Sequence, residues 1–364
     1  MALDDLPIRP DLRGKMPYGA PMLDVPVTLN VNENTHPVPH EVRASILSAV
    51  DAALESINRY PDREFTGLRQ ALVDYLNARP GADAAPVQVE QIWAANGSNE
   101  VLQHVLQAFG GPGRSVLGFP PTYSMHPIIA EATGTTWIGA DRDAHYEISP
   151  DTAVSAIAAH RPELVFFCSP NNPTGTGVAL ETIEAAYNAT DGMVLVDEAY
   201  VEFAPDNHPS ARRLLAGRPR LLISRTMSKA FAFAGARVGY LLAHPDVVDA
   251  MRLVRLPYHL SALTQAAATA ALAHHETMLA TVDAIRTQRD RLVDQLTAMG
   301  YDVSPSLANF VLFSGVSDPQ GVFRGLLDQG VLVRDVGIAH SLRVTAGTEA
   351  ETTSFLEALG RLET

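Results

Sequence analysis

Short apolar runs separated by longer segments dominate the chain between residues 91 and 224. The interiors of five runs are nearly free of charge: QIWAA, SVLGF, ELVFFCS, GMVLVDE and RLLIS. Strands that are apolar on both faces are typical of a parallel sheet covered by helices on both sides. The segments between the runs are long enough for those helices. The pattern therefore predicts an α/β fold with a mostly parallel central sheet.

The pattern changes after residue 260. Residues 264–300 form a long stretch rich in alanine and leucine, which favours helix. Three short strand-like pieces follow, NFVLFSG, GVLVRDV and SLRVTAG, and then a final helical segment with Thr348 as its cap. We expect the long stretch to bridge two domains and the tail to form a smaller α+β domain.

These patterns divide the chain into three parts. Residues 1–49 are expected to be an N-terminal arm and part of the small domain. Residues 50–255 are the predicted large, ligand-binding domain, and residues 256–364 the interdomain helix and small C-terminal domain. The arm is rich in proline and asparagine and too polar to pack alone, so we expect it to lie against another surface.

Composition excludes several classes of partner and cofactor. The 364 residues include 41 acidic and 27 basic side chains, a formal charge of −14, with no long basic run, which argues against a nucleic-acid partner. The single cysteine, Cys168, excludes an intrachain disulfide and a cysteine metal cluster, and the histidines form no H-E-x-x-H motif, so no metal site is expected. No segment reaches the ~20 uncharged residues of a membrane span, so we expect a cytoplasmic protein without a membrane partner.

Polar residues follow the first three apolar runs. Ligands of open α/β sheets bind beyond the carboxyl ends of strands, which makes these residues candidates for binding. Ser98 and Asn99 begin an amphipathic helix whose free N–H groups would attract a phosphate, or they only cap that helix. Tyr123 in PPTYSMHP would stack on a flat ligand or pack in the core. Asn172 in SPNNPTGTG would donate to a ligand oxygen or only form a turn.

The last two runs carry charge. Asp197 follows four apolar residues, where a carboxylate needs a positive partner such as a protonated pyridine nitrogen, an arginine or a helix N-terminus. Lys229 stands among apolar neighbours, where desolvation and the nearby Arg237 would favour a neutral, nucleophilic amine. Thr226, Ser228 and Arg237 could form a phosphate cup. Spacings of 25 and 32 residues between Asn172, Asp197 and Lys229 fit successive strand–helix units.

Together these motifs resemble the fold-type I pyridoxal phosphate enzymes of the aspartate aminotransferase superfamily. The similarity covers nearly the whole chain, and SPNNPTG, DEAY and TMSKAFAFAG are diagnostic of the superfamily. The strings LNVNEN, NRYPD, ANGSNE and PPTYSMHP also carry the resemblance. Three others, PYGAP at 17, LPYHLS at 256 and VRDVG at 333, point to its histidinol-phosphate branch. Thr35 in NENTHP and Ala236 in FAGARVG depart from the residues frequent in that branch.

The resemblance implies a role for each candidate residue. Lys229 would hold pyridoxal 5'-phosphate as a Schiff base and shuttle protons, and Asp197 would keep the pyridine nitrogen protonated. Tyr123 would stack on the ring, while Asn172 and Tyr200 would hold its 3′ oxygen. The implied phosphate ligands are Ser98, Asn99, Thr226, Ser228, Arg237 and, from the neighbouring subunit, Tyr60. A homodimer is expected on this ground.

The resemblance also implies the substrates. Arg343 would grip the substrate carboxylate, while Arg334 and Tyr18 would bind the phosphate of histidinol phosphate, with Asn172 also touching the substrate. The implied reaction is ping-pong transamination of L-histidinol phosphate with 2-oxoglutarate, giving imidazole-acetol phosphate and L-glutamate in histidine biosynthesis. The alternatives are an aromatic amino-acid aminotransferase of the same branch, a decarboxylase or lyase of this fold, and a non-catalytic ligand-binding α/β protein.

Overall fold

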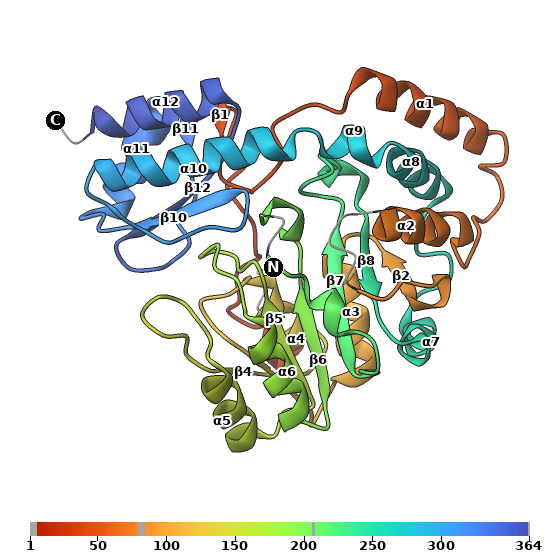
Figure 1. Ribbon diagram of the computed structural model, residues 1–364. Coiled ribbons are helices and arrows are strands. Elements are labelled where there is room, and N and C mark those ends of the chain that lie inside the picture. Colours follow the sequence, from red (N-terminus) through yellow and green to blue (C-terminus); the bar gives the residue numbers. More distant parts are fainter. Residues whose placement is uncertain (1–5, 79–83, 206–207, 363–364) are drawn as a thin grey trace.

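The computed structural model describes residues 6–78, 84–205 and 208–362. Figure 1 shows a large sheet surrounded by helices and, beside it, a smaller body formed mainly by the C-terminal part of the chain. Each body has its own apolar core. Within the described ranges, no helix is both long enough and apolar enough to span a bilayer.

The large sheet has seven strands in the order β2-β8-β7-β6-β5-β3-β4. Their bounds are β2 (Ile92–Ala95), β3 (Ser115–Gly118), β4 (Thr136–Gly139), β5 (Leu164–Cys168), β6 (Met193–Asp197), β7 (Leu221–Thr226) and β8 (Gly239–Leu242). All neighbours run parallel except β8, which is antiparallel to both β2 and β7. The prediction of a mostly parallel sheet is confirmed, and the five predicted strands are present. The sequence analysis did not anticipate β4 and β8.

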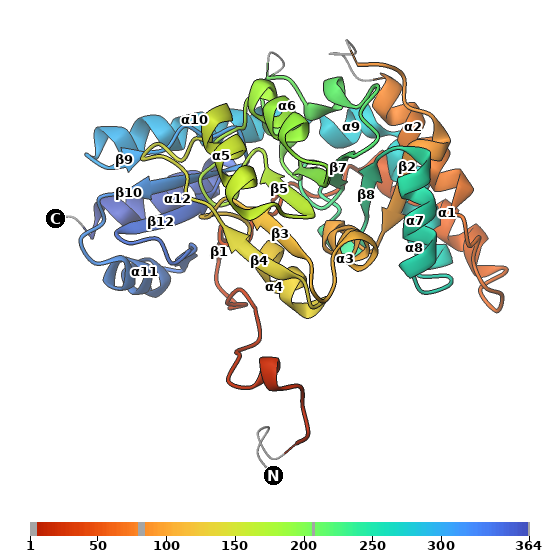
Figure 2. The same ribbon diagram turned by 90° about the horizontal axis from the view of Figure 1, so that it is seen from below.

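Helices cover both faces of this sheet, as buried parallel strands require. Figure 2 shows α5 (Pro150–His160) and α6 (Leu180–Ala189) on one face, and α3 (Ser98–Phe109) and α4 (Met125–Ala132) on the other. The helix α7 (Pro245–Val254) packs beside α3. Beyond the β2 edge, three further helices pack together: α1 (His40–Leu54), α2 (Thr66–Ala78) and α8 (Ala262–Ala273).

The smaller body is built on the antiparallel sheet β12-β10-β9. Its strands are β9 (Asp302–Val303), β10 (Phe310–Ser314) and β12 (Ser341–Thr345), and its helices are α10 (Val282–Ala298), α11 (Pro319–Asp328) and α12 (Glu349–Gly360). The predicted cap is present: the Thr348 hydroxyl accepts from Glu351 N, and the Glu351 carboxylate accepts from Thr348 N, forming a capping box. This local signal fixes where the last helix begins.

The N-terminal segment joins the small body through β1 (Val27–Thr28), which pairs in parallel with β11 (Val331–Leu332). Residues immediately after β1 are buried between the two bodies, as we expected of a polar arm. The part from residue 6 to about residue 14 extends away from the body in Figure 2 and is largely exposed, whereas Lys15 pairs with Glu131 of α4. Within this one chain, it is the part of the arm from β1 onward that packs against other surfaces.

The helical stretch 264–300 is not one continuous helix. It is divided into α8, α9 (His275–Leu279) and α10, with breaks at His274 and at residues 280–281. The α8 segment packs on α1 and α2, whereas α10 packs on β9 and β10 of the small body. Because these surfaces belong to different bodies, the chain changes direction between them, overriding the local preference for helix.

Candidate active site

A cavity of about 620 Å³ lies where the carboxyl ends of the large sheet meet the small body. Its lining brings together every residue singled out from the sequence except Tyr60. These lining residues are Tyr18, Ser98, Asn99, Tyr123, Asn172, Asp197, Tyr200, Thr226, Ser228, Lys229, Arg237, Arg334 and Arg343. They come from strand ends, helix starts and loops that are far apart in the sequence, as expected for a site at this edge of an α/β sheet.

Asp197 is the last residue of β6 and is 1% exposed. Its Oδ2 lies 3.1 Å from Nε2 of His126, a buried residue of α4. Its Oδ1 has no hydrogen-bond partner in the part of the chain that the structure describes, although it is fully buried. A buried carboxylate oxygen without a donor is costly, so this atom offers a place for a positively charged N–H of a ligand.

His126 is a functional candidate that the sequence analysis missed. It stands three residues after Tyr123 in the same PPTYSMHP string, and its ring contacts Tyr123 edge-on with centroids 5.5 Å apart. Its position at the very start of a helix, three residues after the predicted ligand-stacking tyrosine, was the available signal. Its partner Asp197 is distant in sequence, and only the folded chain reveals the pair.

Lys229 lies in the loop after β7 with its amine 3.0 Å from the carbonyl oxygen of Val31. Burial lowers the pKa of Lys229 to about 8, and the charges of Arg343 and Arg237 add to this effect while Glu33 opposes it. A substantial fraction of the amine is therefore neutral near physiological pH. Nucleophilic attack on a carbonyl requires this neutral form.

A cup with free donors lies at the start of α3. Gly97 caps the helix with φ of 83°, a conformation that favours glycine. A Cβ at Gly97 would lie 2.3 Å from Nη2 of Arg237, so only glycine allows the guanidinium to approach this helix end. The Arg237 Nη1 and the Thr226 hydroxyl both donate to the Ser228 hydroxyl, at 3.5 and 3.0 Å. The cup therefore joins a helix N-terminus, hydroxyls and a guanidinium, which suits a phosphate.

Two phenols and an amide form the floor of the cavity. The Tyr123 hydroxyl donates to Oδ1 of Asn99 at 3.2 Å. The Tyr200 hydroxyl accepts from Nδ2 of Asn32 at 3.0 Å and from Nδ2 of Asn172 at 3.4 Å. Burial raises the pKa of both Tyr123 and Tyr200, so both phenols stay neutral and able to donate. Asn32 is a second residue that the sequence analysis did not single out.

Arg343 faces the cavity from β12 and is 6% exposed. Its Nη1 donates to Oδ1 of Asn172 at 2.5 Å and its Nη2 to the carbonyl of Asn30 at 2.7 Å. Burial lowers the pKa of Arg343 to about 10, so the guanidinium still carries its charge at neutral pH. The backbone of half-buried Arg334 pairs with that of Arg343, which places two arginines side by side at the small-body wall.

Tyr60 lies outside the cavity of its own chain. It belongs to the loop between α1 and α2, is 80% exposed, and stacks on Tyr258 with ring centroids 4.4 Å apart.

Within the described ranges, no group of three or more histidine, cysteine or acidic side chains is arranged to hold a metal ion.

Comparisons with known proteins agree with this site. The family model described as aminotransferase class I and II matches residues 25–359. The histidinol-phosphate aminotransferase of Paenarthrobacter aurescens is 58% identical over 99% of this chain and 96% of its own length, and that of Thermobifida fusca is 55% identical over 98% and 96%. These matches span almost the whole of each protein.

A solved structure supports the fold. The crystal structure of histidinol-phosphate aminotransferase from Sinorhizobium meliloti in complex with pyridoxal-5'-phosphate has a TM-score of 0.80 to this chain, with 24% identity, over 93% of this chain and 92% of that one. The fold-type I architecture is thereby confirmed. Given the family match and the relatives above half identity, the chain belongs to the class I and II aminotransferases and, among them, to the histidinol-phosphate aminotransferase family.

Proposed function

We propose that this chain is a pyridoxal phosphate-dependent aminotransferase that transfers the amino group of L-histidinol phosphate to 2-oxoglutarate in histidine biosynthesis. The products are imidazole-acetol phosphate and L-glutamate. The observation that carries the proposal is one cavity in which a lysine of lowered pKa, a buried carboxylate and three arginines meet. The aromatic amino-acid alternative is not favoured, because the relatives at 53–58% identity are histidinol-phosphate aminotransferases. The intact lysine and carboxylate argue against a non-catalytic protein.

The residues present fit the cofactor. The unpartnered Oδ1 of Asp197 would accept from a protonated pyridine nitrogen, and His126 would fix the orientation of this carboxylate from its other oxygen. Tyr123 would stack on the pyridine ring, while Asn172 and Tyr200 would hold its 3′ oxygen. The phosphate would lie in the cup at the start of α3, held by Ser98, Asn99, Thr226, Ser228 and Arg237.

When bound, the cofactor supplies an electron sink for the carbanion left after the α-proton departs. Asp197 maintains the positive charge on which this sink depends. Lys229 would hold the cofactor through its amine, and the same amine would accept the proton from the substrate α-carbon as a general base. Its neutral amine, favoured by burial, is the form that accepts this proton. Tyr200 holds its own hydroxyl proton beside Asn172 and orients the reacting groups.

The side of the cavity that faces the small body would select the substrates. Arg343 presents a planar fork suited to the α-carboxylate of glutamate. Its buried Nε has no hydrogen-bond partner among the described residues, which leaves a further donor. Arg334 and Tyr18, which also line the cavity, would bind the phosphate of histidinol phosphate. One cavity then serves two different anions in turn, which corresponds to ping-pong kinetics.

The proposal includes a cytoplasmic homodimer. Tyr60 is exposed and lies outside the cavity of its own chain, so its assigned contact with the cofactor phosphate requires a second copy. Large apolar side chains near it are exposed as well, namely Ile57, Leu253 and Leu256. Burial of such side chains stabilises subunit interfaces. Light scattering tests this part: a monomeric mass would remove Tyr60 from the site.

The reaction itself is tested by spectroscopy and kinetics. Purified protein is mixed with pyridoxal 5'-phosphate, and its visible absorbance is followed on addition of L-histidinol phosphate or, in parallel, L-phenylalanine. We expect a visible band that histidinol phosphate removes and 2-oxoglutarate restores. A response to phenylalanine alone would favour the aromatic enzyme and withdraw the roles of Tyr18 and Arg334. Failure to form any visible band would refute the proposed activity.

A further inference from the structure

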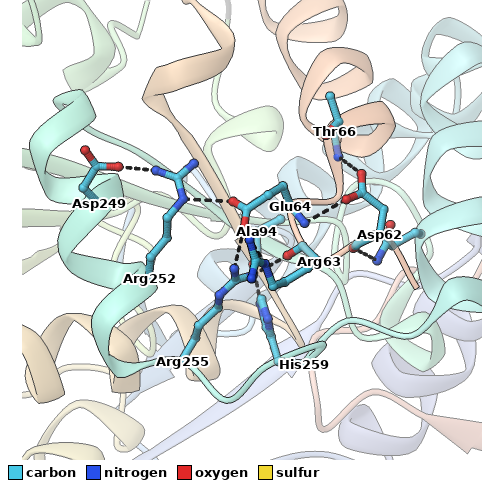
Figure 3. Close-up of polar contacts among 10 residues, drawn as sticks. Asp62, Arg63, Glu64, Thr66, Ala94, Asp249, Arg252, Arg255 and His259 are labelled. Carbon is cyan, nitrogen blue, oxygen red and sulfur yellow. Dashed lines mark hydrogen bonds and ion pairs between the residues drawn. The ribbon is translucent and has the colours of Figure 1, made fainter. Parts of the chain in front are cut away.

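The loop that carries Tyr60 is clamped to the body of its own chain by one carboxylate. Figure 3 shows Glu64 between two arginines that follow one another along and just after α7. Glu64 Oε2 accepts from Nε of Arg252 at 2.9 Å, and Oε1 accepts from Nη2 of Arg255 at 2.5 Å. Arg255 also donates to the carbonyl of Arg63, so it grips the loop at two consecutive residues. This clamp is only partly exposed, which reduces its screening by water.

The end of the loop is fixed by a second carboxylate. Asp62 Oδ2 accepts from the backbone N–H of Thr66 at 2.7 Å, and its Oδ1 accepts from Glu64 N at 2.9 Å (Figure 3). Asp62 therefore satisfies free donors at the start of α2. Between α1 and this cap, Tyr60 is the most exposed aromatic residue. Its hydroxyl makes no hydrogen bond within the described part of the chain.

The Tyr60 ring is nevertheless held from one side. It stacks on Tyr258 with an interplanar angle of 14°. Tyr258 has φ of +59°, an unusual conformation for a bulky residue that persists only where its surroundings impose it. The next residue, His259, supplies that constraint: its ring stacks on Trp93 and its Nε2 lies 2.9 Å from the carbonyl of Ala94.

The same segment also contacts the phosphate cup of its own chain. Asn96 Nδ2 donates to the carbonyl of His259 at 2.8 Å, and Asn96 directly precedes the Gly97 cap of α3. Arg255, the residue that grips the loop, lies over the ring of Trp93 at 5.3 Å. The loop of Tyr60 is thus tied at several points to buried residues of the large body.

Building on the dimer of the proposed function, we infer that Glu64, clamped by Arg252 and Arg255, is a positioning residue that holds the Tyr60 loop ready for the cofactor phosphate of the neighbouring subunit. An exposed loop loses conformational freedom when its side chain engages a ligand, which weakens binding. The clamp and the Tyr258 stack remove that freedom in advance. Glu64 itself touches no reacting atom and lines no part of the cavity.

The experiment compares the cofactor with its phosphate-free form. The dissociation constants of pyridoxal 5'-phosphate and of pyridoxal are measured on the wild type, Glu64→Gln, Tyr60→Phe and the double variant. We expect Glu64→Gln to weaken binding of pyridoxal 5'-phosphate by about three- to tenfold and to leave pyridoxal binding unchanged. In the Tyr60→Phe background, which lacks the hydroxyl, Glu64→Gln should have no further effect.

Two further variants separate positioning from general stability. Asp249→Asn removes the other ion pair of Arg252 but leaves Glu64 in place, so it is the matched control and should not change either dissociation constant. Arg252→Gln removes one arm of the clamp and should weaken phosphate-dependent binding less than Glu64→Gln does. It also serves as the test if Glu64→Gln does not fold. The mass of each variant is checked by light scattering at the concentration of the titration.

The outcomes separate the inference from the proposed function. Equal weakening of both ligands, or the same effect of Glu64→Gln with and without the Tyr60 hydroxyl, would show that the clamp only stabilises the fold and would overturn the inference. If Tyr60→Phe weakens phosphate-dependent binding but Glu64→Gln and Arg252→Gln do not, the inference alone is wrong. If Tyr60→Phe itself has no effect, the assignment of Tyr60 across the dimer is wrong, while the transfer reaction is still judged by its absorbance test.

Discussion

The two walls of the cavity are held by different kinds of contact. We call the first the large-sheet wall, comprising Ser98, Asn99, Tyr123, Asn172, Asp197, Tyr200, Thr226, Ser228, Lys229 and Arg237, and the second the small-sheet wall, comprising Tyr18, Asn30, Asn32, Arg334 and Arg343. On the large-sheet wall, Asp197 ends a strand whose interior is fully buried, and Lys229 follows another. On the small-sheet wall, Arg343 is the only member within a strand, and the N-terminal segment is attached to it by hydrogen bonds.

This difference suggests that the large-sheet wall carries the chemistry and that the small-sheet wall distinguishes between substrates. A close-packed core fixes the large-sheet wall, so its side chains keep their positions when a ligand changes. The small-sheet wall depends on a network in which Arg343 bonds both to Asn172 and to Asn30, and Asn32 bonds to Tyr200 and to Thr345. Substitutions on the large-sheet wall should therefore remove chemistry for every substrate, whereas those on the small-sheet wall should distinguish between substrates.

Lys229→Ala should have the largest effect, because it removes the attachment and the general base together. We expect kcat to fall on the order of 10⁴-fold or more with both amino donors. The melting temperature near pH 7 should not fall. The folded state lowers the pKa of Lys229 to about 8, below its usual value, so the protonated lysine is disfavoured by folding at this pH and its loss relieves that cost. Retention of more than a small fraction of turnover would contradict this assignment.

Asp197→Asn should have the next largest effect. The amide keeps the shape of the side chain but removes the charge that maintains the pyridinium, and we expect kcat to fall on the order of 10³-fold. Both half-reactions, with histidinol phosphate and with glutamate, should slow to a similar extent while KM changes little. A loss confined to one substrate would place Asp197 in substrate recognition instead.

Arg343→Lys tests the opposite wall. Lysine keeps the charge but loses the planar fork, so we expect KM for glutamate and 2-oxoglutarate to rise by about 10- to 100-fold with a much smaller change in kcat. Arg334→Lys is the matched variant and should raise KM mainly for histidinol phosphate. The contrast between the walls would fail if either variant lowered kcat equally for both substrates.

The smallest expected effect comes from the charge of Arg343 on the small-sheet wall, which lowers the pKa of Lys229 on the large-sheet wall. After burial, the charge of Arg343 is the strongest cause of the lowered pKa of Lys229. With a pKa of about 8, the neutral fraction of Lys229 rises about tenfold between pH 7 and pH 9. The rate at which cofactor-free protein captures pyridoxal 5'-phosphate, followed by visible absorbance, should rise to the same extent and then level off. Arg343→Gln should shift this profile to higher pH, and a rate still rising above pH 10 would indicate an unperturbed lysine.

The sequence predicted the large-sheet wall better than the small-sheet wall. Asp197 ends one apolar run and Lys229 lies in the short loop after another, so local pattern and fold class together place them at one edge. The sequence did not reveal His126 as a site residue, because its partner Asp197 is 71 residues away. Asn30 and Asn32 escaped because their partners in β12 are 313 residues away. Periodicity does not encode such pairings.

The secondary structure shows the same limit. Thr348 is a local signal and marked the start of α12 correctly. The break at His274 had no comparable signal, because no glycine or proline interrupts the stretch there and the change of direction comes from packing on two different bodies. The antiparallel β8 was missed for a related reason: its neighbours β2 and β7 are set by the sheet, not by the four residues of the strand.

The 313-residue separation between Asn30 and Arg343 also imposes an order on synthesis. At roughly 5–20 residues per second, a ribosome needs roughly 15–60 s to make the chain between them. The strands of the large sheet, the last of which ends at Leu242, all emerge during that interval. The first segment of the small-sheet wall leaves the ribosome long before the strand that receives it. The cavity is therefore completed only after Arg343 has been made, and a shorter nascent chain has no working site to expose to substrates.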